Sequence, residues 1–311
     1  MRTRLLALLC VVGGRAKRPA PEEADVPSPR TAWSGSPRFR RQWTACQKRM
    51  VESAGLYVQA PADEHRLVLL GDSITESWRG ASICVQMPRA RAVPDVLART
   101  LAARWPSPVV LGIGGDMTQH VLWRLSEGGE LTPTMAADPR LVTVVLIGTN
   151  NLGRGHDATQ TVAGVVAVAR HLLEHTRGKV VLNALFPRGD GAKRSHAPMT
   201  ADPAGGPPRR TFLPLIARVN AALNASASGA LAKAFPGRLS YVDCSAVYFS
   251  RRPNADEEVK VRLMPDKLHP NALGHKIWAE CLNDAIARAV GEDPKIGKDI
   301  ESLQSWATAK S

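Results

Sequence analysis

A serine hydroxyl at the end of an apolar strand is the first group in this chain that could take part in a reaction. Residues 66–73 (Arg-Leu-Val-Leu-Leu-Gly-Asp-Ser) predict a short strand that stops at Gly71 and continues into Asp72 and Ser73. In an open α/β sheet, ligands bind outside the carboxyl ends of the strands, so Ser73 is placed for nucleophilic chemistry. The alternative is structural, because Asp and Ser are also preferred N-caps for a following helix over residues 74–79.

A second reactive pair lies near the other end of the chain, where Asp266 precedes His269 by three residues and Pro270 follows. Proline suits the first turn of a helix, which puts both residues in the preceding loop. At this spacing the carboxylate can accept a hydrogen bond from one ring nitrogen, leaving the other nitrogen to take a serine proton. The alternative is an Asp cap beside a surface histidine. The order Ser73, Asp266, His269 favours a nucleophile, an orienting acid and a base.

Two glycine- and asparagine-rich segments offer hydrogen-bond donors for an oxyanion. Gly115 lies in Gly-Ile-Gly-Gly-Asp (112–116), Asn150 lies in Gly-Thr-Asn (148–150), and each segment follows an apolar run. Backbone N–H groups and side-chain amides are the groups that stabilise a tetrahedral intermediate. Individually, such residues more often only form turns. Met117 breaks the Gly-x-Gly-x-x-Gly spacing, which argues against a dinucleotide site.

Several other polar residues are expected to be structural. We expect Asp72 and Asp116 to be caps that steady the site loops, with a bond from either residue to a neighbouring loop as the alternative. His275 falls inside the last predicted helix, where a structural role is expected. His171 and His175 are four residues apart but lack the glutamate directly after the first histidine that a His-Glu-x-x-His zinc site requires, so no metal site is predicted.

These groups must be positioned by apolar runs that alternate with helical patterns, the signature of a parallel sheet flanked by helices. The predicted strands cover residues 67–70, 109–113, 141–147, 179–185 and 239–242. The predicted helices cover residues 93–104, 119–125, 158–176, 213–234 and 273–290. The fold class is therefore α/β, with a five-stranded parallel sheet and helices on both faces.

Together, these blocks resemble those of the SGNH, or GDSL-type, hydrolase superfamily. The matching residues are Gly71-Asp72-Ser73, Gly115, Gly148-Thr149-Asn150, and Asp266 with His269, and the resemblance spans about residues 65–285. Within the superfamily, three segments are similar to the catalytic subunits of intracellular platelet-activating-factor acetylhydrolases. They are residues 112–125, 147–151 and 186–189.

The resemblance implies a flavodoxin-like three-layer α/β/α sandwich with no metal or organic cofactor. It also implies that Ser73 is the nucleophile, that His269 is the base, and that Asp266 orients the base. The Ser73 N–H, the Gly115 N–H and the Asn150 side chain would form the oxyanion hole. The predicted function is hydrolysis of a carboxylic ester, with a small acyl group such as acetyl favoured.

Substrate choice does not carry over from the resemblance. Val110 stands where the related subunits have an asparagine, and residues 79–106 and 188–210 match no segment of the family. The substrate is therefore an ester of a small molecule, a lipid or a carbohydrate. Two alternatives stay open, an acyltransferase that uses the same triad and a non-catalytic binding or scaffold protein. The oligomeric state is also left open, with a homodimer as one option.

The ends of the chain are expected to lie outside the hydrolase domain. Residues 1–16 fit a cleaved signal peptide, with a basic start, an apolar stretch and small residues. We predict a basic Pro/Ser/Arg-rich linker at 17–49, the domain at 50–290 with a flexible insertion at 188–210, and a polar tail at 291–311. The signal predicts secretion or a secretory-pathway lumen, although the arginine-rich leader also suits an organelle transit peptide, and a cytoplasmic location is the third alternative.

The basic charge of the chain is concentrated at its start. Residues 1–49 contain 11 Arg and Lys but 3 Asp and Glu, so they hold most of the formal net charge of +13. Although the sequence pI is about 10.0, the body lacks a basic helix interleaved with aromatic residues, so we predict no nucleic-acid partner. No apolar stretch approaches the ~20 residues of a membrane span.

Five cysteines remain to be explained, at positions 10, 46, 84, 244 and 281. Removal of the leader leaves four, and an even number in a secreted chain permits two disulfides. The spacings match no zinc pattern, and isolated buried thiols are the commoner explanation.

Overall fold

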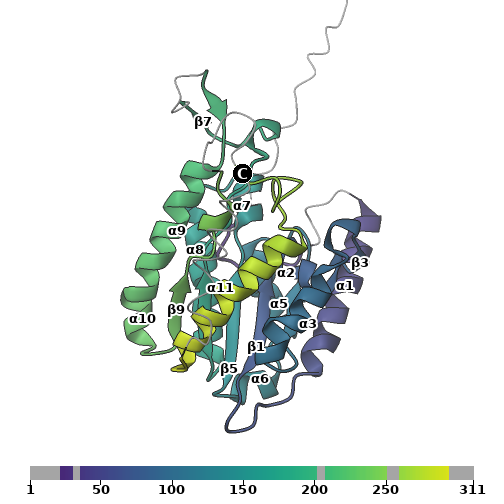
Figure 1. Cartoon of the computed structure of the whole chain (residues 1–311), viewed down its shortest axis with the longest axis vertical. Coiled ribbons are helices and arrows are strands. Elements are labelled where there is room, and N and C mark those ends of the chain that lie inside the picture. Colours follow the sequence, from purple (N-terminus) through teal and green to yellow (C-terminus); the bar gives the residue numbers. More distant parts are fainter. Residues whose placement is uncertain (1–21, 31–35, 202–206, 251–258, 294–311) are drawn as a thin grey trace, which may run out of the picture.

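The central feature of the fold is a parallel sheet, seen in a computed structural model that describes residues 22–30, 36–201, 207–250 and 259–293. Five strands have the order β4-β1-β5-β6-β9, and every neighbouring pair is parallel. They are β1 (Arg66–Gly71), β4 (Val109–Gly112), β5 (Leu141–Leu146), β6 (Lys179–Asn183) and β9 (Leu239–Val242). Two-residue strands form two small hairpins, β2 (Ala81–Ser82) with β3 (Val85–Gln86), and β7 (Met199–Thr200) with β8 (Arg209–Arg210). The predicted five-stranded sheet is confirmed (Figure 1).

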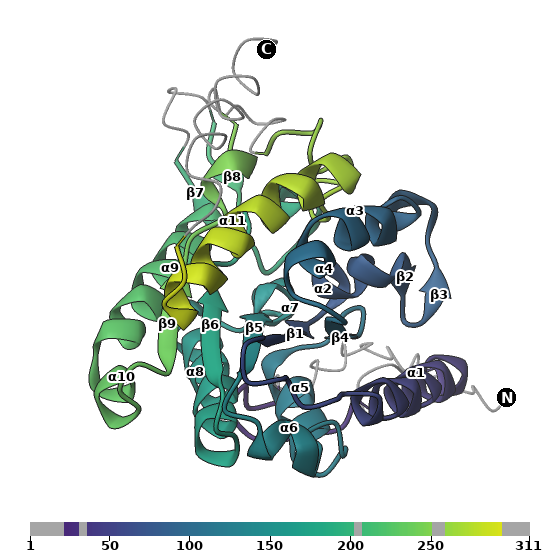
Figure 2. The same cartoon turned by 60° about the horizontal axis from the view of Figure 1, so that its bottom comes forward.

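Helices cover both faces of this sheet. The α-helices are α1 (Pro37–Gly55), α2 (Ser73–Glu76), α3 (Val93–Arg99), α4 (Leu101–Arg104), α5 (Thr118–Leu125), α6 (Pro133–Ala137), α7 (Thr149–Arg154), α8 (Ala158–His175), α9 (Leu213–Ser228), α10 (Ala230–Ala234) and α11 (Ala272–Val290). Short 3-10 helices are η1 (Ser77–Arg79), η2 (Pro88–Ala90), η3 (Gly191–Lys193) and η4 (Ala246–Tyr248). Figure 2 shows α3 and α11 on one face and α5 and α8 on the other. This is the predicted three-layer α/β/α arrangement.

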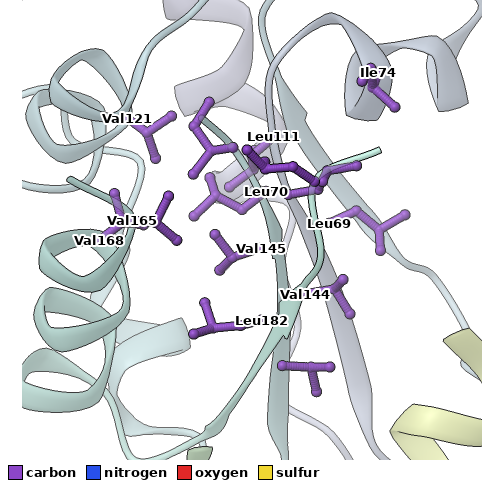
Figure 3. Close-up of a cluster of buried hydrophobic side chains, with 14 of the residues drawn as sticks. Leu69, Leu70, Ile74, Leu111, Val121, Val144, Val145, Val165, Val168 and Leu182 are labelled. Carbon is purple, nitrogen blue, oxygen red and sulfur yellow. The ribbon is translucent and has the colours of Figure 1, made fainter. Parts of the chain in front are cut away.

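The strands are apolar on both sides because both of their faces are covered. Leu70 and Val145 point toward α5 and α8, whereas their neighbours Leu69 and Val144 point to the opposite face (Figure 3). All six residues of β5 are buried. This continuous apolar pattern is what made the strands recognisable in the sequence.

The register of the parallel strands gathers three loops at one edge of the sheet. Gly71 at the end of β1 pairs with Gly112 at the end of β4 and with Leu146 at the end of β5. The segments that begin at Asp72, at Ile113 and just after β5 therefore leave the sheet side by side. These are the segments that carry the predicted site residues.

The predicted linker at 17–49 is wrong for the residues that the structure describes, because Ala24 and Arg30 are buried and residues 37–49 belong to α1. Trp43, Cys46 and Met50 are buried on one side of this helix, which contacts β4. The basic residues that suggested a linker are mostly on its exposed side, as with Arg41 and Lys48. An amphipathic helix thus accounts for the positive charge without an extended segment.

The predicted flexible insertion at 188–210 contains defined structure. Arg188 is buried and forms a two-point ion pair with Asp190, at 2.7 and 2.8 Å. This ion pair and the β7–β8 hairpin fix most of the segment, while residues 202–206 lie outside the described part. The prediction of a flexible insertion, which rested on the glycine and proline content of the segment, is therefore wrong for the described residues.

Two disulfides join distant parts of the domain, Cys46 to Cys84 and Cys244 to Cys281. The interpretation of these cysteines as isolated thiols is therefore wrong, because the fold brings each pair together from separate elements. The predicted signal peptide at 1–16 and most of the predicted tail at 291–311 lie outside the described residues. In the described ranges, no helix has the length and apolar character needed to cross a membrane.

Candidate active site

Ser73 is the first residue of α2, immediately beyond the end of β1. Asp72 is the N-cap of this helix, because its carboxyl group accepts a hydrogen bond from the Ile74 N–H at 3.0 Å. Burial raises the pKa of Asp72 to about 7. The two interpretations of this segment are therefore compatible, the structural one applying to Asp72 and the chemical one to Ser73. Asp72 caps the helix, and the hydroxyl of Ser73, a residue with 8% of its surface exposed, points at a histidine.

That histidine is His269, and it continues a chain of hydrogen bonds from Ser73. Ser73 Oγ lies 2.8 Å from His269 Nε2, and His269 Nδ1 lies 2.7 Å from Asp266 Oδ2. The serine and the histidine are 196 residues apart in sequence, so this contact depends on the complete sheet. The structure brings together the three residues that the sequence predicted as a triad.

A tight turn holds the acid and the base in position. The second carboxylate oxygen of Asp266 accepts the backbone N–H groups of Leu268 at 3.0 Å and His269 at 2.7 Å. Lys267, between them, has a φ of +63°, in the left-handed region that only a few per cent of non-glycine residues adopt. The Asp266 side chain is 44% exposed and that of His269 is 15% exposed.

The surroundings of His269, burial above all, favour its neutral form. Burial lowers the pKa of His269 below its ordinary value, while the hydrogen bond to Asp266 opposes this shift and the nearby Arg89 cation adds to it. Burial alone would raise the pKa of Asp266, but hydrogen bonds from the His269 ring and from the backbone N–H groups of His269 and Leu268 hold that pKa well below the usual range. An ionised acid beside a neutral imidazole is the state in which His269 can accept a proton.

Two backbone N–H groups at this edge are open to a ligand. Gly115 follows β4 with a φ of +80°, and Gly112 at the end of β4 pairs with Gly71 next to Ser73. Within the part of the chain that the structure describes, neither the Ser73 N–H nor the Gly115 N–H donates a hydrogen bond to another protein group. They are the groups expected from the sequence to face an oxyanion.

Asn150, the third predicted donor, also lies at this edge but has protein partners. Its Nδ2 is 2.9 Å from the Asp116 carbonyl oxygen and 3.1 Å from Asp72 Oδ2. Both of its amide hydrogens are therefore engaged, and the amide links the loops that follow β1, β4 and β5. To donate to a ligand, Asn150 would have to release one of these contacts.

Asp116 is the centre of a buried ionic network that sequence reasoning missed. It accepts hydrogen bonds from Trp43 Nε1 at 2.8 Å and from Arg124 at 2.9 Å. Arg124, fully buried, also pairs with Glu130 and donates to the Leu111 carbonyl at 2.7 Å. Asp116 is therefore not a cap, and its side chain instead bonds neighbouring elements, which was the alternative left open by the sequence. The only signal in the sequence was a charged residue inside an otherwise apolar helical pattern.

His275 has the structural role expected of it. It is buried, and its Nε2 lies 3.3 Å from the Ile74 carbonyl oxygen, while burial lowers its pKa to about 4. Asn271 caps α11 and the helix begins at Ala272, so Pro270 precedes the helix instead of occupying its first turn. His275 thus anchors α11 to the helix that carries Ser73.

Other potential metal ligands do not form an evident metal site. His171 and His175 stack with ring centroids 4.2 Å apart on one side of α8. Among the described residues, one cluster offers three ligand atoms, and it consists of Cys46, Glu76 and Cys84. Its two sulfur atoms are joined as a disulfide, so they are not thiolates that could bind a metal.

Comparison with known proteins identifies the family. The model of the GDSL-like lipase/acylhydrolase family matches residues 69–277, which is about two thirds of the chain and includes Ser73, Gly115, Asn150, Asp266 and His269. The chain belongs to this family. The family predicted from the sequence is therefore confirmed.

Similarity to individual members of the GDSL-like family is partial in sequence and broad in fold. A segment of 79 residues is 48% identical to platelet-activating factor acetylhydrolase IB subunit alpha1 of Bos taurus and of Homo sapiens, and covers 25% of this chain and 31% of each relative. The matched segment thus spans about a third of those relatives.

Two solved structures match over most of their length. A protein assigned as an acylhydrolase from Bacteroides fragilis NCTC 9343 aligns with a TM-score of 0.54 and 20% identity, covering 78% of this chain and 96% of the other. A protein described as a platelet activating factor from Streptococcus pneumonia aligns with a TM-score of 0.52 and 16% identity, covering 79% and 93%. These matches establish the shared fold.

Proposed function

We propose that this protein is a serine esterase that hydrolyses a carboxylic ester, with Ser73 as the nucleophile, His269 as the base and Asp266 as the group that orients the base. The observation that carries the proposal is the continuous hydrogen-bonded chain from Ser73 Oγ through His269 to Asp266. Family membership supports the same reaction class, because acylhydrolases cleave ester bonds.

The geometry supplies both halves of a double-displacement reaction. Ser73 Oγ attacks the acyl carbon as its proton passes to His269 Nε2, and the alcohol leaves with that proton. Water then attacks the acyl-enzyme, gives a proton to His269, and releases the acid and the free Ser73 hydroxyl. Asp266 stays ionised throughout and stabilises the imidazolium.

Charge that develops on the carbonyl oxygen would meet the Ser73 and Gly115 N–H groups. Both are free in the described structure, and donors of this kind each contribute roughly 2.7 to 4 kcal/mol to lowering the barrier. Asn150 is proposed as the third donor, with its amide shifting from Asp72 to the oxyanion. The buried Asp116 carbonyl would keep the amide in place during this exchange.

A small acyl group, acetyl first, is the proposed substrate group. The support is the names of the alpha1 and alpha2 relatives, which are acetylhydrolase subunits and share a 79- or 80-residue segment with this chain. The alcohol part of the ester, whether on a lipid, a carbohydrate or a small molecule, is set by walls that include residues 79–106.

The decisive experiment compares p-nitrophenyl acetate hydrolysis by the full chain and by Ser73→Ala. We expect the variant to lose roughly 10⁶-fold in kcat, as in other serine hydrolases that lose the nucleophile. Equal rates would remove Ser73 from the mechanism. Labelling by a fluorophosphonate probe in the wild type and not in the variant checks the same hydroxyl independently. Absence of both turnover and labelling would favour a binding protein, and transfer of acetyl to added glycerol would favour an acyltransferase.

We also propose that the protein acts in the secretory pathway or outside the cell. The support is the pair of disulfides, which persist in oxidising compartments and are rare in the cytosol, together with the signal-like sequence at 1–16.

A further inference from the structure

A segment ahead of the family match runs across the loop that carries Gly115. We call residues 22–30 the N-terminal strap. Its backbone is held at three points: Thr118 Oγ1 donates to the Ala24 carbonyl at 2.6 Å, the Ser28 N–H donates to the Gln119 carbonyl at 3.1 Å, and His156 Nε2 lies 2.7 Å from the Glu22 carbonyl. The strap is therefore fixed against the beginning of α5, next to the predicted oxyanion loop.

The last residue of the strap, Arg30, places a buried cation behind that loop. Its side chain is 3% exposed, and its Nη1 donates to the Gly114 carbonyl oxygen at 2.5 Å. The same nitrogen lies 3.5 Å from Asp116 Oδ1, and the guanidinium lies 4.7 Å from the centre of the Phe39 ring. A Cβ atom on Gly115 would come within 2.5 Å of Arg30 Nη2, so glycine at this position lets the guanidinium lie directly against the backbone.

The carbonyl that Arg30 binds and the N–H of Gly115 are the two ends of one peptide group. A cation at the oxygen end draws electron density along the conjugated amide and strengthens the N–H as a donor, as in chains of hydrogen bonds that polarise one another. On the other side, the Gly114 N–H donates to the buried carboxylate of Glu76 at 2.5 Å. The two consecutive peptide groups, between residues 113 and 114 and between residues 114 and 115, are thus each held by a charged side chain. This fixes the direction of the Gly115 N–H, which belongs to the second of them.

We propose that Arg30 is a positioning residue that aims and polarises the Gly115 N–H, so that this N–H stabilises the oxyanion of the ester reaction. The inference rests on the proposed function. Arg30 itself touches neither substrate nor the reacting atoms, and its effect belongs to the transition state, because only then does the carbonyl oxygen carry negative charge.

The test uses full-length Arg30→Met and Arg30→Lys. Active sites are counted with a fluorophosphonate probe, and kcat with p-nitrophenyl acetate is expressed per counted site. We expect Arg30→Met to lower kcat per site roughly tenfold, less than the ~10²-fold loss of a complete donor, with KM within about twofold. Arg30→Lys keeps the charge but not the planar guanidinium, and we expect a loss of roughly threefold.

The matched control is Arg238→Met. Arg238 also donates to backbone carbonyls, those of Gly178, Leu173 and Thr176, but at the other end of the sheet, beside the start of β9. We expect this variant to lower the melting temperature while kcat per site is unchanged.

The outcomes separate the inference from the proposed function. A kcat per site within twofold of wild type in both Arg30 variants, with Ser73→Ala inactive, would overturn the role of Arg30 and leave the esterase intact. Activity in Ser73→Ala would overturn the esterase itself. If Arg30→Met does not fold, Arg30→Lys decides, because a purely structural role lowers the number of counted sites and leaves kcat per site unchanged.

Discussion

His269 contacts Ser73 with one ring nitrogen and Asp266 with the other, so its protonation state controls the proposed reaction. The same ring is close to Arg89, which donates to Ser77 Oγ at 3.0 Å one helical turn beyond the nucleophile. Burial and this positive charge act in the same direction, and the Asp266 carboxylate acts against them. The balance keeps the imidazole neutral at a lower pH than an isolated histidine.

The pH dependence of kcat/KM follows from that balance. Because the active form of His269 is neutral and its pKa is lowered, we expect the acid limb to have its midpoint below the ordinary histidine value of about 6.5. Arg89→Gln removes a positive charge, which should raise the pKa of His269 and move the midpoint to higher pH. Arg170→Gln, an exposed control on α8, should leave the midpoint unchanged; a shift in both variants, or in neither, would contradict the assignment.

Replacement of the acid should cost less than replacement of the nucleophile. We expect Asp266→Asn to lower kcat by roughly 10² to 10⁴-fold, compared with ~10⁶-fold for Ser73→Ala, because an amide can still hold the ring but not stabilise the imidazolium. Steady-state kinetics with p-nitrophenyl acetate measures both. The reverse order would mean that another acid supports His269.

Individual site residues were predictable from the sequence where reactive residue types also lie close together along the chain. Asp266 and His269 are three residues apart, and the turn that joins them is local. Arg30, Glu76 and Arg124 escaped detection because their roles depend on partners distant in sequence, such as the Gly114 peptide group. A buried charge is recognisable only when the residues that neutralise it are known.

The elements around the site are held together by α1 and by the two disulfides. Cys46 on α1 is bonded to Cys84, whose N–H donates to Glu76 at 2.7 Å, and Glu76 in turn accepts the Gly114 N–H. This disulfide therefore supports the loop that presents Gly115. Cys244–Cys281 instead joins the segment after β9 to α11. The sequence could not distinguish the disulfides from thiols, because pairing depends on which helices and loops the fold places side by side.

The two disulfides offer an internally matched comparison, because they span 38 and 37 residues. Loss of either should lower the free energy of unfolding by a similar amount, about 2 to 4 kcal/mol, since chain entropy depends on loop length. We expect only Cys46→Ala/Cys84→Ala to lower kcat as well. Urea denaturation and kinetics of this variant and of Cys244→Ala/Cys281→Ala test the contrast; equal kcat in the two double variants would show that the first disulfide does not support the site.

Across the whole molecule, the three-layer architecture was predictable because continuous apolar strands and periodic helices mark a parallel sheet. The predicted start of the domain at residue 50 is too late, because α1 begins at Pro37 and its many basic residues give it the composition of a linker. In α1 the arginines and lysines occupy the exposed side, while Trp43 reaches the buried Asp116. Composition averaged over a segment hides such a division between faces.

The proposed secretory location has a direct test. Expressed in cells with a secretory pathway, the full chain should appear in the medium or lumen with both disulfides formed, as measured by thiol titration before and after reduction. Replacement of Leu5 and Leu6 by Asp should retain the protein in the cytosol with free thiols, because a signal requires its apolar segment. Oxidised protein in the lumen despite this change would exclude 1–16 as the signal.

The N-terminal strap limits how far the N-terminus can be removed by proteolysis without loss of Arg30. Cleavage near residue 16 leaves residues 22–30 intact, so a processed chain keeps Arg30 beside the Gly114–Gly115 peptide group. A protease that cuts after Arg30, within residues 31–35, would leave the triad and both disulfides untouched but would free the strap to leave its three anchoring contacts. Trimming at the N-terminus would then lower kcat by about as much as Arg30→Met, because the triad itself stays in place.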